Sequence, residues 1–280
     1  MTLPSSGPIS LLEIQNEFGG SNPIGINEYY GITTGIPLSG TISLADFYGK
    51  SSSPTTNGLI ANWKPSSYSG TGNWNDSYTD DPTGNNYMIK VGSPTYTSGT
   101  PSYFTTSNNN HWEVADAAKP TGSYAAASIF FWLYQTSGTS VQGGLENRYG
   151  SGTQFGLEIQ STGSIGRIGY FWNNNASNTW GYDTTLTLDS NTWYLVGLTL
   201  DSTEVIFYRG TSSTLSTNTR TFTHTSQTIA SNNKFYYGSD PENSSRGFQG
   251  RLAECWFYNR KLNNSEVTTI YNSTKATYGF

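Results

Sequence analysis

Short runs of alternating apolar and polar residues dominate the chain from about residue 58 onward. In the strand predicted over residues 192–200, the side chains of Tyr194, Val196, Leu198 and Leu200 fall on one face at period two, which indicates one buried side. Clusters of Gly, Asn, Ser and Asp separate it from the other predicted strands, at residues 58–64, 87–91, 126–134, 155–160, 165–172, 204–209, 234–238 and 248–259. About a dozen strands over ~220 residues predict one β-sandwich rather than two small domains.

An internal repeat near the start predicts two short helices. The sequence SGPISL at residues 6–11 returns as SGTISL at residues 39–44, and Ser10 and Ser43 can each cap the helix that follows. Two helices of two or three turns bury too little surface to be stable alone, so we expect this segment to order against another surface, namely the rest of the chain, its own copies or a larger assembly. The apolar side chains expected to anchor it are Leu11, Leu12, Ile14 and Phe18 from the first copy and Leu44, Phe47 and Tyr48 from the second.

Composition divides the chain into three parts. Residues 51–57, with the sequence SSSPTTN, carry no large apolar side chain and are predicted to be a linker. The helical segment of residues 1–50 precedes this linker, and a strand-rich domain of residues 58–280 follows it. That domain closes with a short helix predicted over residues 265–272, which Asn263 or Asn264 can cap.

The chain carries few charges and many aromatic residues, 12% and 15% respectively. Its net charge is −5, and the longest basic run is the pair Arg260-Lys261, whereas a nucleic-acid binder needs a basic stripe that displaces counterions from phosphates. No apolar run approaches the ~20 residues of a membrane-spanning helix. We therefore expect neither nucleic-acid binding nor membrane insertion. The single cysteine, Cys255, excludes an intramolecular disulfide and is expected to be a small buried side chain.

Three stretches within residues 58–273 resemble the laminin-G-like, concanavalin A-like jelly-roll family. The sequence AASIFFWL at residues 126–133 is similar to the family's strand with an aromatic residue and a buried Trp near its end, and NTWYLVGLT at residues 191–199 resembles a second family strand. The most specific match is FQGRLAECWFYNRKL at residues 248–262, together with the helix after it. The resemblance implies an all-β fold, a concanavalin A-like antiparallel β-sandwich jelly roll, preceded here by a small helical N-terminal segment.

The first 50 residues resemble a different group of proteins. The doublet of Ser-Gly-x-Ile-Ser-Leu, with Phe47-Tyr48-Gly49 closing the second copy, is similar to N-terminal segments of virion structural proteins of tailed phages, especially those of marine cyanobacteria. The resemblance implies that residues 1–50 bind other virion proteins of the capsid, neck or tail. It also implies a homo-oligomer on the outer surface of the phage particle.

Glycoside hydrolases share this fold family, so carboxylate pairs are the first candidates for chemistry. Retaining cleavage needs two carboxylates ~5 Å apart, commonly at alternate positions of one strand. The spacing fails at each candidate, namely Glu158-Ile159-Gln160, Glu254 before Trp256, and Glu113 before Asp116. The two histidines, His111 and His224, have no nucleophile motif nearby and are expected to be ordinary strand or loop residues. These observations predict that the protein is not an enzyme.

No motif requires a cofactor, and calcium is the one ion that the family resemblance implies. Laminin-G-like jelly rolls often hold calcium through loop carboxylates and carbonyls, and the sequence DDPTGNN at residues 80–86 resembles the family's Asp-x-Ser-Gly-Asn loop. The candidate ligands are Asp80, Asp81, Asn85 and Asp240. A turn held by Asp and Asn side chains without any metal is the alternative interpretation.

Aromatic rings and amides concentrate in residues 172–183, with the sequence WNNNASNTWGYD. Lectins hold sugar faces against aromatic rings, and they bind sugar hydroxyls with amides and carboxylates from loops on a rigid scaffold. The candidate glycan-binding residues are Trp172, Asn174, Trp180, Tyr182 and Asp183, with Trp74 from a second aromatic loop. The alternative is that these rings cover the ends of the sandwich.

Together, the two resemblances predict a non-enzymatic phage virion structural protein. Its N-terminal segment docks on the particle, and its jelly roll projects outward to bind a host-surface glycan or to decorate the capsid. Two alternatives stay open, a free carbohydrate-binding lectin module and a glycoside hydrolase of the same fold. A free lectin has no need of the helical repeat, and a hydrolase needs a carboxylate pair.

Overall fold

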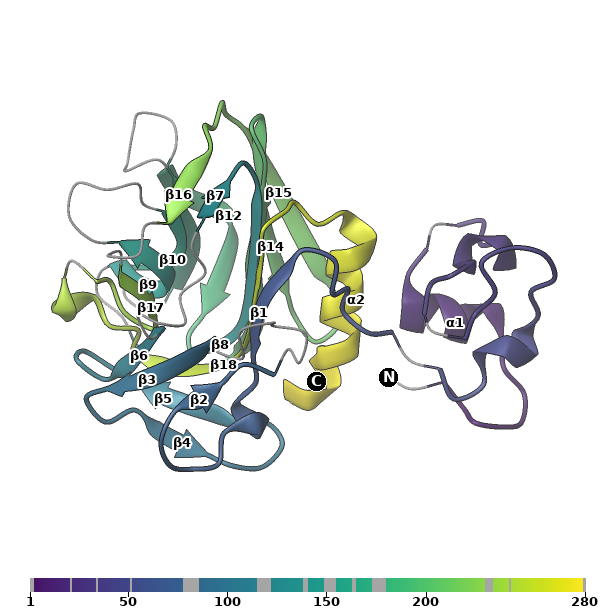
Figure 1. Ribbon diagram of the computed structural model, residues 1–280, viewed down its shortest axis with the longest axis horizontal. Helices are drawn as coiled ribbons and strands as arrows, with labels where there is room; N and C mark the ends of the chain where they lie inside the picture. The colour runs from purple at the N-terminus through teal and green to yellow at the C-terminus, as the bar shows by residue number, and fades with distance from the viewer. Residues whose placement is uncertain are drawn as a thin grey trace. The chain divides into compact units, whose positions relative to one another are not determined.

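A computed structural model describes residues 3–20, 22–33, 35–50, 52–77, 86–114, 122–137, 141–148, 155–162, 165–172, 180–229, 234–241 and 243–278. The chain divides into two compact units (Figure 1). Residues 1–57 and 262–280 make up the first unit, and residues 58–261 make up the second. The domain boundaries expected from the sequence, which assign residues 262–280 to the jelly roll, remain a prediction.

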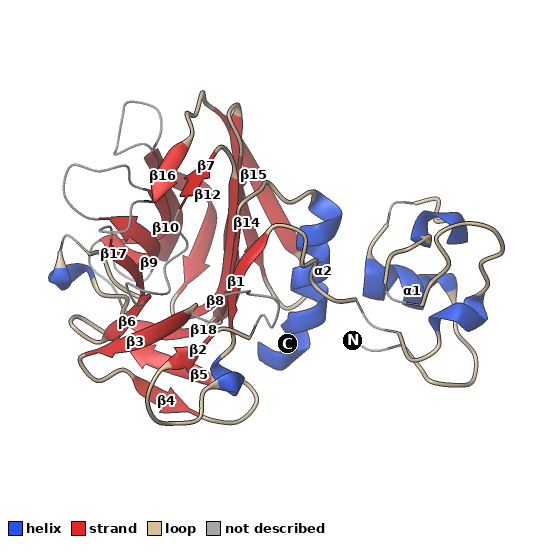
Figure 2. Ribbon diagram, viewed as in Figure 1, coloured by secondary structure: helices blue, strands red, loops and turns tan. Residues whose placement is uncertain are grey.

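Short helices form the first unit (Figure 2). They are α1 (Leu11–Phe18), the 3₁₀ helices η1 (Ile26–Tyr29), η2 (Leu44–Phe47) and η5 (Lys275–Tyr278), and α2 (Asn264–Thr274). The Ser10 hydroxyl accepts a hydrogen bond from the Glu13 amide (3.2 Å), and the Glu13 carboxylate accepts one from the Ser10 amide (2.7 Å). This reciprocal cap starts α1 where the sequence predicts it. The same exchange of roles caps α2 between Asn263 and Glu266. None of the described helices is long and apolar enough to cross a lipid bilayer.

The internal repeat is also a structural repeat. Gly7 and Gly40, at equivalent positions, have φ angles of +93° and +88°, which a side-chain-bearing residue rarely adopts. The carbonyl of Gly7 accepts a hydrogen bond from the Tyr48 hydroxyl (2.5 Å), and the carbonyl of Gly40 accepts one from the Tyr30 hydroxyl. Each tyrosine directly follows a 3₁₀ helix. Together with the two residues after them, these helices have the sequences INEYYG and LADFYG, a second repeat that was not predicted from the sequence.

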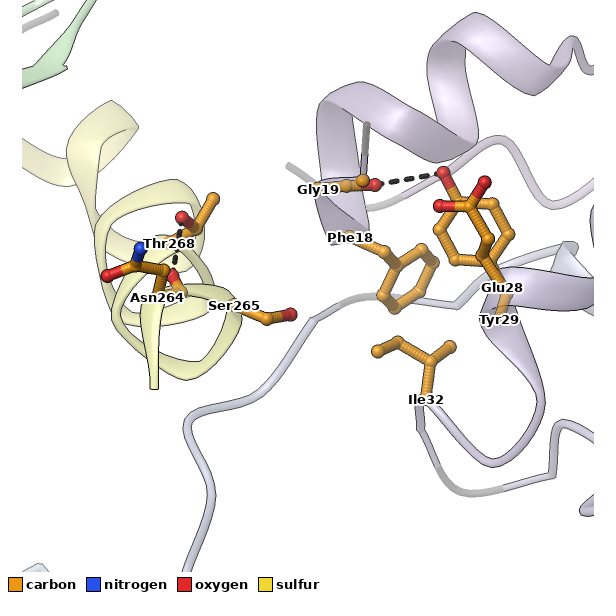
Figure 3. Close-up of a pocket in the computed structure, with 9 residues that line it drawn as sticks. Phe18, Gly19, Glu28, Tyr29, Ile32, Asn264, Ser265 and Thr268 are labelled. Atoms are coloured by element: carbon orange, nitrogen blue, oxygen red, sulfur yellow. Dashed lines mark hydrogen bonds between the residues drawn. The ribbon is translucent and has the colours of Figure 1, made fainter. Parts of the chain in front are cut away.

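The first unit builds an aromatic core of its own. The rings of Phe18, Tyr29 and Phe47 meet with centroids 5.8–6.3 Å apart, and the Tyr29 hydroxyl donates to the Gly19 carbonyl (2.8 Å, Figure 3). A cavity of about 360 Å³ lies beside this core, with Thr268 of α2 in its lining. The expected anchor residues therefore separate into two groups. Ile14, Phe18 and Phe47 are buried in the core, Leu11 is half-buried, and Leu12, Leu44 and Tyr48 are exposed.

This separation corrects the expectation that all seven side chains anchor the segment to the particle. The two repeats bury aromatic side chains against each other, so residues 1–50 themselves supply part of the surface against which their helices order. Leu38 and Leu12, with 85% and 62% of their surface exposed, are the most exposed large apolar residues that the structure describes.

Two antiparallel eight-stranded sheets form the second unit (Figure 1). Sheet A has the order β15-β14-β13-β8-β18-β5-β4, with β1 also paired to β18, and sheet B has the order β12-β11-β10-β9-β17-β6-β3-β2. The strands of sheet A are β1 (Leu59–Trp63), β4 (Thr95–Thr97), β5 (Tyr103–Thr106), β8 (Ala127–Gln135), β13 (Trp193–Leu200), β14 (Glu204–Gly210), β15 (Leu215–Thr221) and β18 (Gly250–Tyr258). Those of sheet B are β2 (Trp74–Asn75), β3 (Tyr87–Val91), β6 (His111–Val114), β9 (Val141–Arg148), β10 (Phe155–Thr162), β11 (Ile165–Trp172), β12 (Trp180–Asp189) and β17 (Lys234–Tyr237).

Smaller elements complete this unit: β7 (Gly122–Tyr124) pairs with β16 (Gln227–Ile229), and η3 (Pro65–Ser67) and η4 (Ser244–Arg246) are single 3₁₀ turns. One core fills the space between the two sheets. It joins side chains such as Phe131, Val196 and Cys255 of sheet A to Trp112, Leu157 and others of sheet B. The fold is the antiparallel β-sandwich jelly roll that the sequence predicts, and that prediction is confirmed.

A buried carboxylate cluster on the outer face of sheet B

Two of the predicted sugar-stacking rings are core residues. Trp74 and Trp172 have 0% and 2% of their surface exposed, and both pack in the core between the sheets. The Trp74 indole donates to the Lys64 carbonyl (2.8 Å), and the Trp172 indole donates to the Thr225 carbonyl (2.6 Å). A ring that is enclosed on both faces cannot stack on a sugar, so these two assignments are wrong and the alternative that the sequence left open holds for them.

Asp183 is also buried, and its role is to hold a turn in the backbone. Its carboxylate accepts hydrogen bonds from the amides of Thr185 (2.8 Å) and Leu186 (2.6 Å), from the Thr185 hydroxyl and from the Asn218 amide group. Burial alone would raise the pKa of Asp183, but these hydrogen bonds outweigh it and lower the pKa below its ordinary value. Asn174 lies outside the described residues, and of Trp180 the structure describes only the backbone, which pairs with Phe171.

The predicted calcium ligands are not brought together among the residues that the structure describes. Asp80, Asp81 and Asn85 lie outside the described ranges. Asp240 is buried, and its carboxylate forms an ion pair with Arg246 (2.9 Å), which leaves it a poor ligand for a cation. Within the described ranges, no group of three or more His, Cys, Asp or Glu side chains is placed to hold a metal ion. Calcium binding therefore remains a prediction.

Tyr182 belongs to a polar cluster that the sequence did not reveal. On the outer face of sheet B, Gly156 of β10 pairs with Glu146 of β9, and Glu158 lies two residues further along β10. Because alternate residues of a strand share a face, the two carboxylates project from neighbouring strands on the same side. Their companions in the same strands, Leu145 and Leu157, point into the core.

The register extends this cluster across six strands. Glu158 pairs with Gly169 of β11, which pairs with Tyr182 of β12. On the other side, Glu146 pairs with Tyr236 of β17, which pairs with Glu113 of β6. His111 lies two residues before Glu113 in β6, and its ring packs on that of Tyr236. We call the carboxylate cluster the set of these six outer-face side chains, namely His111, Glu113, Glu146, Glu158, Tyr182 and Tyr236.

Glycines on β10 and β11 let aromatic rings lie across the strands. A Cβ atom on Gly169 would come within 2.3 Å of the Tyr182 ring and 3.2 Å of the Glu158 side chain. A Cβ atom on Gly156 would come within 2.8 Å of the Phe171 ring. Any other residue at these positions would push a ring away, so the glycines bring Tyr182 and Phe171 close to the two carboxylates.

The electrostatics of the cluster follow from burial. Glu146 and Glu158 have 0% and 4% of their surface exposed. Burial raises the pKa of Tyr182 well above its ordinary value of 10, and Glu158, which accepts a hydrogen bond from its hydroxyl, raises it further, as does Glu146. Arg246 acts in the opposite direction. Tyr182 therefore stays a neutral hydrogen-bond donor at physiological pH.

His111 lies at the edge of the cluster as a neutral base. Its ring packs 4.6 Å from the Tyr236 ring, and burial lowers its pKa from 6.5 to about 4. Neither ring nitrogen has a hydrogen-bond partner among the described residues. A buried polar atom without a partner costs stability, and such atoms are commonly reserved for a water molecule or a ligand.

The sequence analysis considered Glu113, Glu158 and Glu254 but looked for pairs within one strand. The structure places Glu254 in sheet A, where Lys64 (3.2 Å) and Asn62 (3.1 Å) hold its carboxylate, apart from the cluster. It pairs Glu158 with Glu146, which lies on the adjacent strand and was not considered. The pairing register of β9 and β10 brings Glu146 and Glu158 together. This register cannot be predicted from the spacing of two acidic residues 12 positions apart.

Solved structures with a similar fold come from several different proteins. Domain 4 of AbnA, a GH43 extracellular arabinanase from Geobacillus stearothermophilus, was determined in complex with arabinotriose; it is 14% identical, with a TM-score of 0.54 over 76% of this chain and 98% of that domain. A Trypanosoma rangeli sialidase is 16% identical, with a TM-score of 0.56 over 91% of this chain and 38% of that protein. The binding domain of a botulinum neurotoxin of serotype D/C is 12% identical, with a TM-score of 0.50 over 78% of this chain and 52% of that domain.

These comparisons correct the prediction that the protein is not an enzyme. Two of the three similar folds occur in an arabinanase and in a sialidase, so neither the fold nor a missing one-strand motif excludes catalysis. At 12–16% identity the likeness shows a shared fold alone. It establishes no activity for this chain.

The resemblance of the strand-rich region to laminin-G-like jelly rolls is confirmed, whereas the phage resemblance of residues 1–50 stays a prediction. The comparison with curated proteins found no match. A laminin G family model, described as the concanavalin A-like lectin/glucanases superfamily, matches residues 98–268, which is more than half of the chain. The chain therefore belongs to the concanavalin A-like lectin/glucanases superfamily.

Proposed function

We propose that the protein binds a glycan on the outer face of sheet B, through the carboxylate cluster. The observation that carries the proposal is the meeting of Glu146 and Glu158 from adjacent strands beside the half-buried ring of Tyr182, whose hydroxyl donates to Glu158. Sugar hydroxyls donate hydrogen bonds to carboxylates, and aromatic rings take up the apolar face of a pyranose. Both kinds of contact converge here on a rigid sheet, which orders no new element on binding.

Two further features support a ligand at this face. Tyr182 and Tyr236 are half-buried, so their rings are the part of the cluster that a ligand reaches from solvent. The ring nitrogens of His111 offer one donor and one acceptor that the described residues leave unused. A sugar with several hydroxyls can satisfy such groups together.

The test is a glycan array with the full chain and its Glu158→Gln variant. The amide is isosteric but loses half of the acceptor capacity and the charge, so we expect at least a tenfold weaker affinity for the bound glycan. Glu254→Gln is the matched control, because it makes the same change at an equally buried carboxylate in the other sheet, and it should leave the affinity unchanged. Equal affinity of the Glu158→Gln variant and the unchanged chain would rule out this site.

Glycoside cleavage is a second candidate, favoured by the same pair of carboxylates. Glycosidases commonly use two acidic side chains, one as acid and the other as nucleophile or base. Incubating the array-positive glycan with the chain and measuring new reducing ends distinguishes cleavage from binding. Cleavage at this site requires that both Glu146→Gln and Glu158→Gln abolish product formation.

We further propose that the protein is a virion component, with residues 1–50 docking on the particle and the jelly roll presenting the glycan site to a host surface. The described features that support docking are the exposed apolar side chains Leu12, Leu38, Leu44 and Tyr48, which the unit's own core does not use. The proposal includes binding of residues 1–50 to other virion proteins, a homo-oligomeric state and a position on the outer surface of the particle.

The docking proposal makes a prediction about truncation. A chain that begins at Asn57 should fail to join particles when it is supplied to infected host cells during assembly, whereas residues 1–50 fused to an unrelated protein should join them. Immunoblots of purified particles measure both. Incorporation of the truncated chain at the level of the full chain would place the attachment surface in the jelly roll.

A further inference from the structure

An arginine on the outer face of sheet A contacts two tyrosine rings, and a tryptophan ring packs against both tyrosines. Arg251 of β18 pairs with Tyr134 of β8, which pairs with Trp193 of β13. The guanidinium carbon lies 4.4 Å from the centre of the Tyr134 ring and 4.8 Å from that of Tyr103 in β5. The Trp193 ring lies 5.6 Å from Tyr134 and 5.8 Å from Tyr103. We call these four side chains the Arg251 cage.

The cage faces away from the core and remains open to solvent in part. The neighbours of Arg251 and Tyr134 along their strands, Leu252 and Leu133, point inward into buried positions, so the cage side chains point outward. Arg251, Tyr134 and Tyr103 are half-buried, and Thr105, opposite Arg251 in the register, is exposed.

The described residues leave the hydrogen-bond donors of this guanidinium unused, although two rings contact it. A guanidinium is attracted to aromatic rings and carries five N–H donors in one plane. The structure gives Arg251 no hydrogen bond and no carboxylate partner among the described residues. Other cations of the sandwich do have one, as Arg246 does with Asp240 (2.9 Å) and Lys261 with Asp201 (2.8 Å).

From this arrangement we infer that the Arg251 cage binds a carboxylate-bearing sugar, a uronic acid residue of an acidic glycan. The planar edge of a guanidinium matches a carboxylate in a two-hydrogen-bond geometry, and the half-buried rings of Tyr103 and Tyr134 can contact the C–H face of the pyranose. A partly desolvated cation also strengthens attraction to an anion relative to bulk water. The site lies on the sheet opposite to the carboxylate cluster, whose acidic side chains would repel such a sugar.

This inference rests on the proposed function only in that its ligand is a glycan. The two sites are on different sheets and select opposite features, hydroxyl donors at the carboxylate cluster and an anion at the cage. Their tests therefore give separate answers.

The test is isothermal titration of the full chain with tetragalacturonate and with its fully methyl-esterified form. We expect the ester to bind at least tenfold more weakly, because it keeps the sugar faces and lacks the charge. Arg251→Gln should lose at least tenfold in affinity for tetragalacturonate and nothing for the ester. Arg251→Lys keeps the charge and the ring contact but loses the planar set of N–H donors. Its affinity for tetragalacturonate should lie between that of the unchanged chain and that of Arg251→Gln.

The controls separate this site from folding and from charge elsewhere on the sandwich. Thermal melting of both Arg251 variants should match that of the unchanged chain, and Lys90→Gln, which removes an exposed cation from β3 of sheet B, should bind tetragalacturonate as the unchanged chain does. Absent binding of tetragalacturonate, equal binding of acid and ester, or an Arg251→Gln affinity equal to that of the unchanged chain would each overturn the inference. Equally tight binding of tetraglutamate would also overturn it, because a cage that recognises charge alone is not a sugar site.

Discussion

Replacing Trp172 with alanine is expected to lower the free energy of unfolding by about 3–5 kcal/mol. The ring is 98% buried, packs with its centroid 5.2 Å from that of Phe155, and donates a 2.6 Å hydrogen bond to the Thr225 carbonyl. Its removal leaves a cavity in the core and takes the donor away from the Thr225 carbonyl. For a domain of this size, the loss corresponds to a fall in melting temperature of roughly 6–20 °C.

Urea unfolding and thermal melting measure this effect, and two variants calibrate it. Trp172→Phe keeps a ring and loses the N–H group, so it should cost about 1–2 kcal/mol. Ile165→Ala changes a more exposed apolar side chain in the same strand and should cost much less. A Trp172→Ala variant that melts with the unchanged chain but loses glycan binding would return Trp172 to the list of sugar-stacking residues.

Acidification should destabilise the protein through His111. Its pKa is about 4 in the folded chain and 6.5 when exposed, so between these values the unfolded chain binds more protons. Stability is therefore fully present above pH 6.5 and is lost as the pH falls toward 4, by about 3 kcal/mol from this one group. The groups around the imidazole are Tyr236 of β17, Glu113 of the same strand and Val91, its partner in β3.

The check is urea unfolding at pH 7, 5.5 and 4.5 with the chain and its His111→Phe variant. Phenylalanine keeps the stacking on Tyr236 and cannot titrate, so the variant should lose about 2–3 kcal/mol less over this range. His224, whose pKa burial also lowers, remains in both proteins and cancels from the comparison. Parallel pH profiles for the two proteins would show that His111 is not buried as a neutral group.

Several strands could be predicted to the residue because their apolar pattern is strong. The boundaries of β3 and β11 match the predicted ranges of residues 87–91 and 165–172. By contrast, β15 has the sequence LSTNTRT, which carries one apolar residue in seven and reads as a loop. It forms an edge of sheet A and pairs along its whole length with β14, so tertiary pairing decides its structure.

The aromatic residues show what composition leaves undetermined. A tryptophan in a polar segment is compatible with a lectin loop and with a core residue, because the indole has an apolar body and one N–H group. Trp74 and Trp172 are core residues whose N–H groups donate to the backbone carbonyls of Lys64 and Thr225, 10 and 53 residues away along the chain. The sequence contains both partners and gives no sign that they meet.

The carboxylate cluster could not be predicted for a related reason. A motif search finds residues at a fixed spacing along one strand, whereas Glu146 and Glu158 are joined by the pairing of β9 with β10, which shifts register between Leu157 and Glu158. The glycines at positions 156 and 169 are the one available signal. Glycine weakens a strand unless the close approach of a neighbouring group requires it. Gly156 and Gly169 both lie near Glu158 in sheet B, so they indicate a crowded outer face there.

The most direct test of the glycan site at the carboxylate cluster is a crystal structure of the chain with the glycan that it binds most tightly on the array. We expect a sugar ring on the outer face of sheet B, with a hydroxyl within 3.2 Å of the Glu146 or Glu158 carboxylate and a pyranose face against Tyr182. A bound sugar held entirely by other residues, with both carboxylates out of its reach, would contradict this site.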